Sequence, residues 1–176
     1  MAQNAFYQGD YQRADEFQQR ALHLDRANPW GNIFYPTAAL YQDRLDEAEK
    51  RIRAAREVLP KDAWLTSCEG MLWAKRGEFA RAERLLRRAL HGGQTMLHTH
   101  HMWHTSAATY ALMSKPGAAL TWLRRAARLG LPNHPAFRDD HHFRGMQQNT
   151  AFHRLLRETK KEWTAYKKEF GRSRAE

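Results

Sequence analysis

The sequence of 176 residues contains one cysteine, Cys68. A single cysteine excludes an intramolecular disulfide and a zinc site built from several cysteines. No hydrophobic run approaches the ~20 apolar residues that a membrane span needs. The first residues, 1–4, are not a basic segment followed by an apolar stretch, as a secretory signal would be. These absences favour a reducing, cytoplasmic location.

Motifs of the common enzyme classes are also missing. The sequence has no Gly-x-Ser-x-Gly nucleophile elbow, no phosphate-binding P-loop and no dinucleotide fingerprint. Cys68 falls inside a predicted helix, where we expect a small packed side chain, because a nucleophilic thiol needs a lowered pKa. The sequence therefore predicts no enzymatic activity and no cofactor.

Acidic residues are few relative to basic ones. Lys and Arg number 29 against 19 Asp and Glu, a formal net charge of +10. This surplus favours an acidic partner, which could be an acidic peptide, a nucleic acid or an anionic membrane surface. The charge alone does not choose among these three.

What the sequence does contain is a repeat. Three segments with the same pattern begin 34 residues apart, and each is followed at a fixed offset by a second small residue, Ala21, Ala55 or Ala89. A fourth copy runs from Ser114 to Ala119 and begins 37 residues after the third, so about three residues are inserted near His98. The three regular copies are Gly9-Asp10-Tyr11-x-x-Ala14, Asp43-Arg44-Leu45-x-x-Ala48 and Gly77-Glu78-Phe79-x-x-Ala82.

This pattern resembles the tetratricopeptide repeat, a helix–turn–helix unit of 34 residues. The resemblance implies an all-α, right-handed α-solenoid of such repeats. The alanines would lie where paired helices cross closely, and the glycines at turns that need positive φ. Asp43 and Ser114 replace this glycine in two copies.

Helix pairs are expected over 1–8 with 11–26, 30–42 with 45–58, 62–76 with 79–91, and 99–113 with 116–129. The corresponding units are a truncated first repeat (1–28), repeat 2 (29–62), repeat 3 (63–96), repeat 4 (97–132), and a closing loop with a capping helix (133–176). Because only eight residues precede Gly9, we expect further repeats before residue 1.

Residues 97–165 resemble the last repeat and closing segment of bacterial signalling proteins, in which such arrays are appended to kinases, winged-helix regulators or cyclase-like domains. The similarity rests on His100-His101, Ala119-Leu120-x-Trp122-Leu123, Gly130-Leu131-Pro132 and Pro135-x-Phe137-Arg138-Asp139. Asn133-His134-Pro135 departs from the usual Cys-x-Tyr-Pro, and Asp140 stands where a proline usually follows. A final helix over about 150–170 is predicted to be the cap, with Phe152, Leu155, Leu156, Trp163 and Tyr166 near one face.

In tetratricopeptide arrays the first helix of each pair lines the concave surface, so equivalent first-helix positions form the predicted site. It is an aromatic, mildly basic groove for a protein or peptide partner. An equally weighted alternative is that the tryptophans fill space between repeats. The predicted groove residues are Trp30, Ile33, Thr37, Tyr41, Trp64, Ser67, Met71, Lys75, His101 and His104.

Histidines cluster at 98, 100, 101 and 104, where helical spacing would let His100 and His104, or His101 and His104, share a face and bind a metal. His134, His141 and His142 could approach from the closing loop. No carboxylate lies between His98 and His104, so we expect ordinary groove or loop histidines and no metal.

Two other binding modes receive less support. Capture of a chaperone's acidic C-terminus requires a two-carboxylate clamp, made of lysines and asparagines at particular first-helix positions. Only Lys75 matches this clamp, and the asparagines are missing. Arginine runs at 81–88 and 124–128 could track phosphates, but no aromatics are interleaved with them, and a solvated outer face is expected. The predicted function is thus a protein-interaction scaffold within a larger bacterial regulator, with a basic nucleic-acid-binding module as the alternative.

Overall fold

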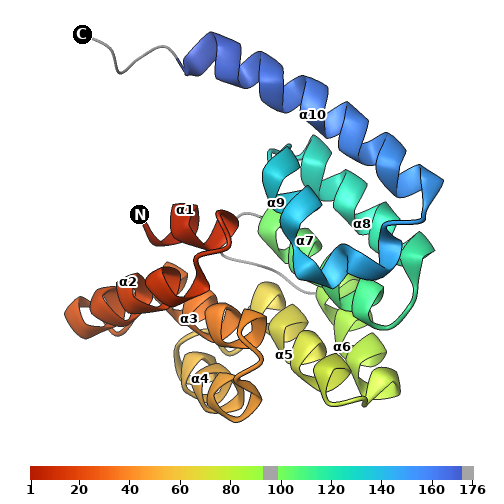
Figure 1. The fold of residues 1–176 in the computed structure, drawn as a ribbon. Helices are drawn as coiled ribbons and strands as arrows, with labels where there is room; N and C mark the ends of the chain where they lie inside the picture. Colours follow the sequence, from red (N-terminus) through yellow and green to blue (C-terminus); the bar gives the residue numbers. More distant parts are fainter. Residues whose placement is uncertain (93–98, 172–176) are drawn as a thin grey trace, which may run out of the picture.

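A computed structural model describes residues 1–92 and 99–171 of the chain, and within them every regular element is a helix (Figure 1). The predicted all-α solenoid is confirmed. The elements are α1 (Ala2–Tyr7), α2 (Tyr11–Leu24), α3 (Pro29–Tyr41), α4 (Leu45–Val58), α5 (Ala63–Lys75), α6 (Phe79–Gly92), α7 (Thr99–Leu112), α8 (Pro116–Arg128), α9 (His134–Asp139), the 3₁₀ helix η1 (His141–Met146) and α10 (Thr150–Phe170).

The helices divide into an inner and an outer set. The inner helices α3, α5 and α7 are buried on almost every side, whereas the outer helix α6 buries only Ala82, Leu86 and Ala89. A helix that is apolar all round belongs in an interior, and one with a narrow apolar stripe belongs on a surface. Successive inner helices pack on one another and so form a continuous core through the array.

The recurring small residues mark the close helix crossings. Ala14, Ala48, Ala82 and Ala119 are all at most 2% exposed. At the crossing of α5 and α6, a Cβ added to Gly70 would lie 3.1 Å from Leu86 Cδ2, so even a methyl group would require the Leu86 side chain to shift. The 34-residue spacing of small residues therefore follows from the packing distance within each pair.

The turn within each pair uses the left-handed backbone conformation. Gly9 and Gly77 have φ of 81° and 83°, and the two residues that replace glycine, Asp43 and Ser114, both have φ of 56°. At Asp43 an ion pair with Lys75 compensates for this backbone conformation: Lys75 Nζ lies 2.6 Å from Asp43 Oδ1. Ser114 is exposed, and its backbone conformation costs free energy that glycine would not incur.

We therefore expect Ser114→Gly to stabilise the chain by about 0.5–1 kcal/mol, since glycine adopts this conformation without steric strain. Urea unfolding measures the change. Ser114→Ala is the control, because alanine keeps the strain and should give no gain. A loss of stability in Ser114→Gly would contradict this account of the turn.

The chain closes with α9, η1 and α10. Phe137, Phe143 and Phe152 are completely buried, and these elements pack against α7 and α8. The first half of α10 buries Leu155 and Leu156, as predicted for a cap, whereas Tyr166 is 50% exposed and Phe170 66%. Figure 1 shows α10 extending past the array toward the side on which α1 lies. None of the described helices is long and apolar enough to cross a membrane.

Candidate functional site

The ten predicted groove residues do come together on the inner helices, but almost all of them are inside the protein. Eight are buried, Trp30 is half-buried, and the Lys75 side chain is only 7% exposed. The eight buried residues are Ile33, Thr37, Tyr41, Trp64, Ser67, Met71, His101 and His104.

An open groove over these residues is therefore the part of the prediction that needs correction. The chain itself covers the concave surface. From α1, Tyr7 stacks on His101 with ring centroids 5.4 Å apart, and from η1, His142 meets the Tyr41 ring at 4.5 Å. The sequence pattern identifies the inner surface but gives no sign of these long-range covers.

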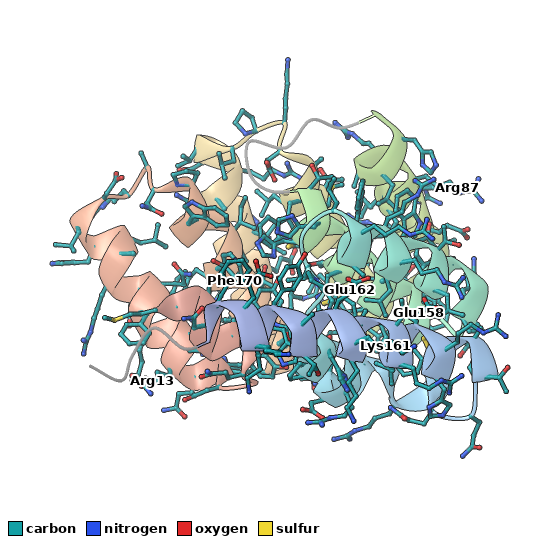
Figure 2. All side chains as sticks on the ribbon, turned by 90° about the horizontal axis from the view of Figure 1, so that it is seen from above. Arg13, Arg87, Glu158, Lys161, Glu162 and Phe170 are labelled. Carbon is teal, nitrogen blue, oxygen red and sulfur yellow. The ribbon has the colours of Figure 1, made fainter. Side chains whose placement is uncertain are left out.

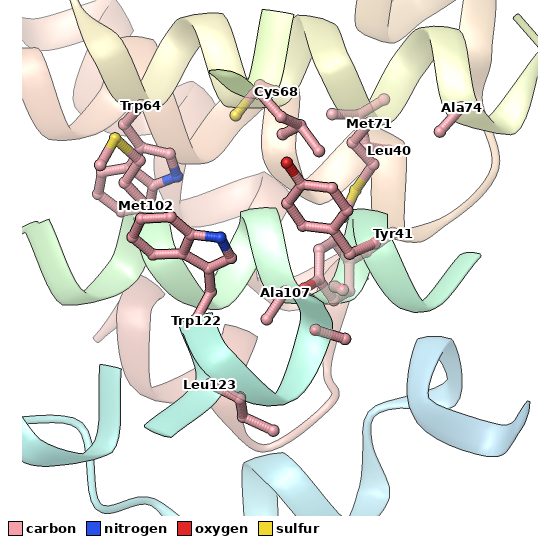
Figure 3. Close-up of a cluster of buried hydrophobic side chains, with 14 of the residues drawn as sticks. Leu40, Tyr41, Trp64, Cys68, Met71, Ala74, Met102, Ala107, Trp122 and Leu123 are labelled. Carbon is pink, nitrogen blue, oxygen red and sulfur yellow. The ribbon is translucent and has the colours of Figure 1, made fainter. Parts of the chain in front are cut away.

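Trp64 resolves the alternative left open for the tryptophans. It is 1% exposed, its Nε1 donates a hydrogen bond to Thr105 Oγ1 at 3.1 Å, and its ring stacks on His101 at 5.1 Å. Figure 3 shows Trp64 in the same cluster as Cys68, Met71 and Met102. Trp30 packs edge-on against Trp64 at 6.5 Å. The two tryptophans fill space between repeats.

The concave side still opens at one end, in a pocket of about 710 Å³. It lies between α1 with the following turn on one side, and α7, α9 and α10 on the other. Three predicted residues, Tyr41, His101 and His104, reach its wall. The remaining lining residues are Gln3, Asn4, Phe6, Tyr7, Gln8, Gly9, Tyr11, His100, Gly130, Leu131, Asn133, Pro135, Ala136, Asp139, Asp140 and Trp163.

His101 ties the two sides of this pocket together. The Gln3 amide donates to His101 Nε2 at 2.8 Å, and the other ring nitrogen, Nδ1, hydrogen-bonds the Tyr7 hydroxyl. Residues almost a hundred positions apart in the sequence thus meet across the superhelix. Burial, together with the negative charge of Asp140, raises the pKa of Tyr7 well above its usual value, so its hydroxyl remains a neutral hydrogen-bonding group.

Asp140 is a buried carboxylate at the base of the pocket. Its Oδ1 accepts from the His142 backbone N–H at 2.9 Å and lies 2.8 Å from His142 Nδ1, while the Tyr41 hydroxyl donates to Oδ2 at 3.2 Å. Burial alone would raise the pKa of Asp140, but the hydrogen bonds and charge of His142, aided by His104, outweigh burial and lower the pKa to about 2. A negative charge is therefore held inside the fold.

The histidines separate into different environments. His104 and His142 both contact Asp140, so His142 does approach His104 from the closing loop. His141 lies next to His142. His134 is buried in α9, near Arg138 and Lys160 rather than in this cluster. His98 lies outside the described residues. The sequence signal that could have found the cluster is Asp140 directly before the His141-His142 pair.

The remaining candidates lie away from the pocket. Cys68 is completely buried, and burial raises the pKa of its thiol to about 12, so it is protonated at neutral pH. The arginine runs are on outer helices, where Arg81 stacks 3.4 Å over Trp73 and Arg125 lies 4.5 Å from the Trp122 ring centroid. Figure 2 shows Arg87 and Lys161 at the outside of the molecule. Arg81 and Arg125 thus cover tryptophan rings of the outer face, as expected of arginines on such a surface.

Comparison with known proteins gave a structural match. Neither the protein-family models nor the curated protein sequences produced one. Among solved structures, the human IFIT1 dimer with m7Gppp-AAAA is similar to this chain, with a TM-score of 0.56 and 15% sequence identity. The match covers 90% of this chain and 38% of that chain. Since that structure is a tetratricopeptide solenoid, the likeness shows the same fold for the chain described here.

Proposed function

We propose that the chain is a binding module that takes a short peptide segment of a protein partner in the pocket between α1 and α7–α10. The observation that carries this proposal is the pocket's size and lining. Its volume of about 710 Å³ is within the ~300–1,000 Å³ of ligand-binding clefts. Aromatic rings and side-chain amides line the pocket. Aromatic rings hold the side chains of an extended peptide, and amides hold its backbone.

The polar lining is suited to peptide backbone. The side-chain amides of Asn4 and Gln8 are exposed, and neither makes a hydrogen bond within the described parts of the chain. Each amide can donate and accept, as a peptide group requires. Trp163, half-buried at the rim on α10, supplies a large ring of the kind that anchors interfaces.

The charge of the pocket differs from that of the whole chain. No Lys or Arg is among its lining residues, whereas Asp139 and Asp140 are. A phosphate backbone needs cationic groups, so this lining favours a neutral or basic peptide segment over a nucleic acid. The acidic partner suggested by the net charge of +10 would have to contact other surfaces.

The experiment selects peptides from a random phage-displayed library on the immobilised full chain, then measures their affinity for variants. Trp163→Ala should weaken binding by ~2 kcal/mol, about 30-fold in Kd, because a buried interface tryptophan is an anchor. Tyr166→Ala, an aromatic truncation on the same helix outside the pocket lining, should leave Kd nearly unchanged. Equal affinity for wild type and Trp163→Ala would contradict a pocket site.

A second candidate, nucleic-acid binding, rests on the exposed outer arginines. Arg84 and Arg88 on α6 and Arg128 on α8 are exposed, and the similar human structure contains m7Gppp-AAAA. Single-stranded RNA titrated at increasing salt tests it, since phosphate contacts give a steep log-linear loss of affinity. Tight RNA binding at physiological salt that falls in Arg88→Ala, with no peptide selected, would replace the peptide proposal.

The cellular setting belongs to the same proposal. The similarity of residues 97–165 to bacterial signalling proteins supports a place within a cytoplasmic bacterial regulator. In such a protein the module would recruit a partner to an attached domain.

A further inference from the structure

One seam of residues runs along the whole of α10. Its members alternate at spacings of four and three residues, as the a and d positions of a coiled coil do. The first three are buried in the chain's own core, where α10 packs against α8 and α9, and the last three lie beyond it. The six seam residues are Phe152, Leu156, Thr159, Trp163, Tyr166 and Phe170.

The second half of the seam is open to solvent. Every residue from 160 to 170 is exposed except Trp163, which is half-buried. The Tyr166 and Phe170 rings stack with their centroids 6.1 Å apart, so they form one continuous aromatic patch. Figure 1 shows this end of α10 projecting beyond α8 and α9. Because packing of an apolar face supplies most of the stability of a helix in a protein, such a face is suited to a partner.

The two edges of this exposed seam carry opposite charges. Lys160 and Lys167 directly follow d residues of the seam, and so occupy the e positions along one edge. Glu162 and Glu169 directly precede a residues, and so occupy the g positions along the other edge. In coiled coils, charges at e and g form salt bridges between helices and determine which partner is accepted.

This charge pattern decides among the possible occupants. A helix that lies on an anionic membrane carries Lys and Arg across its polar face, whereas one edge of α10 is acidic. In an antiparallel pair of two copies of α10, lysine edges would face each other and glutamate edges would face each other, which is repulsive. In a parallel pair, the first half of the second helix would need the space that α8 and α9 already fill. The pattern therefore favours a helix of a different protein.

We propose that the second half of α10 pairs with an amphipathic helix of a partner protein. The apolar seam of the partner packs on Trp163, Tyr166 and Phe170. Its acidic edge faces the lysine edge of α10, and its basic edge faces the glutamate edge. This surface is separate from the peptide pocket, whose lining includes Trp163 but neither Tyr166 nor Phe170.

The test selects helices on the immobilised full chain from a phage-displayed library. Each library member is a helix of about three heptads, with leucine at a and d and either glutamate or lysine at each e and g position. We expect the selected helices to have one acidic edge and one basic edge. Selection of helices with two acidic edges would overturn the proposal, because the net charge of +10 alone would attract them. Recovery of no helix would also overturn it.

Charge reversal on α10 then tests the orientation of the edges. The double variant Lys160→Glu with Lys167→Glu should weaken a selected helix by about 5-fold or more, and replacing the glutamates of that helix by lysines should restore its affinity. The matched control is Lys161→Glu with Lys168→Glu, which changes the net charge equally on the opposite face of α10. Equal losses in the two double variants would overturn the proposal.

Phe170→Ala tests the aromatic seam itself. It should weaken a selected helix by about 10-fold or more, because an aromatic anchor is lost, while peptides selected for the pocket should bind it like wild type. Circular dichroism confirms that the variant remains helical, as expected for a side chain that is 66% exposed. Unchanged affinity of the selected helix for Phe170→Ala would overturn the proposal and leave the peptide pocket unaffected.

Discussion

Trp64→Ala is expected to lower the free energy of unfolding by about 3–5 kcal/mol, the cost of truncating a large aromatic in a packed core. The Trp64 side chain is 1% exposed and contacts three other rings, those of Trp30, Phe34 and His101. The substitution leaves a cavity between α3, α5 and α7, and Thr105 loses the indole donor. Urea unfolding followed by circular dichroism measures the change.

The matched control is Trp163→Ala, which removes the same side chain from the half-buried rim of the pocket. It should cost at most about 1 kcal/mol, since little packing is lost at such a site. The two variants distinguish a tryptophan of the core from one of the binding pocket. Trp64→Ala should lower stability, and Trp163→Ala should lower peptide affinity. Near-wild-type stability of Trp64→Ala would show that the inner surface is open, as the sequence alone suggested.

Arg51→Ala is expected to destabilise the chain by about 3 kcal/mol, because it removes one partner from a buried ion-pair network. The Arg51 side chain is 7% exposed. It pairs with Asp15 of α2 (Nη2–Oδ2, 3.1 Å) and with Glu47, and it donates to the Tyr35 carbonyl at 2.8 Å. Its guanidinium also lies 3.4 Å from the centroid of the Tyr35 ring. The first two repeats are thus joined through this side chain.

The expected loss of stability is at the lower end of the range for buried ion pairs, because Arg51→Ala leaves neither acidic partner both buried and unpaired. Asp15 retains Arg44, at 3.0 Å, and Glu47 is 41% exposed. Arg53→Ala on the same helix is the control: its side chain is 77% exposed, so its pair with Glu49 should contribute no more than about 0.5 kcal/mol. Thermal or urea melts compare the two, and equal losses would contradict the inter-repeat role of Arg51.

The fold could be predicted from the sequence because each repeat encodes it locally. The 34-residue spacing of Gly9, Asp43 and Gly77 identifies the turns, and Ala14, Ala48 and Ala82 identify the crossings. Both features depend on neighbours within one helix pair, so a periodic pattern in the sequence is enough to reveal them. The final helix could be predicted for the same reason, from a local amphipathic pattern.

The site could be predicted only in part because it depends on how far the array curves. Equivalent positions on α3, α5 and α7 do share one surface, as the repeat implies. Whether that surface stays open is decided by contacts across the superhelix, such as Gln3 with His101 and Tyr41 with Asp140. Pairs separated by 98 and 99 residues leave no periodic trace in a single sequence.

Hydrogen–deuterium exchange of the full chain, with and without a library-selected peptide, tests the central claim most directly. We expect slower exchange on binding in residues 1–11 and 130–140, which border the pocket, with little change in α6. Helices α3 and α5 should exchange slowly in both states, because their inner faces are already covered. Protection confined to α6 and α8, or fast exchange of α5 that slows only with peptide, would contradict a closed concave surface with its binding pocket at one end.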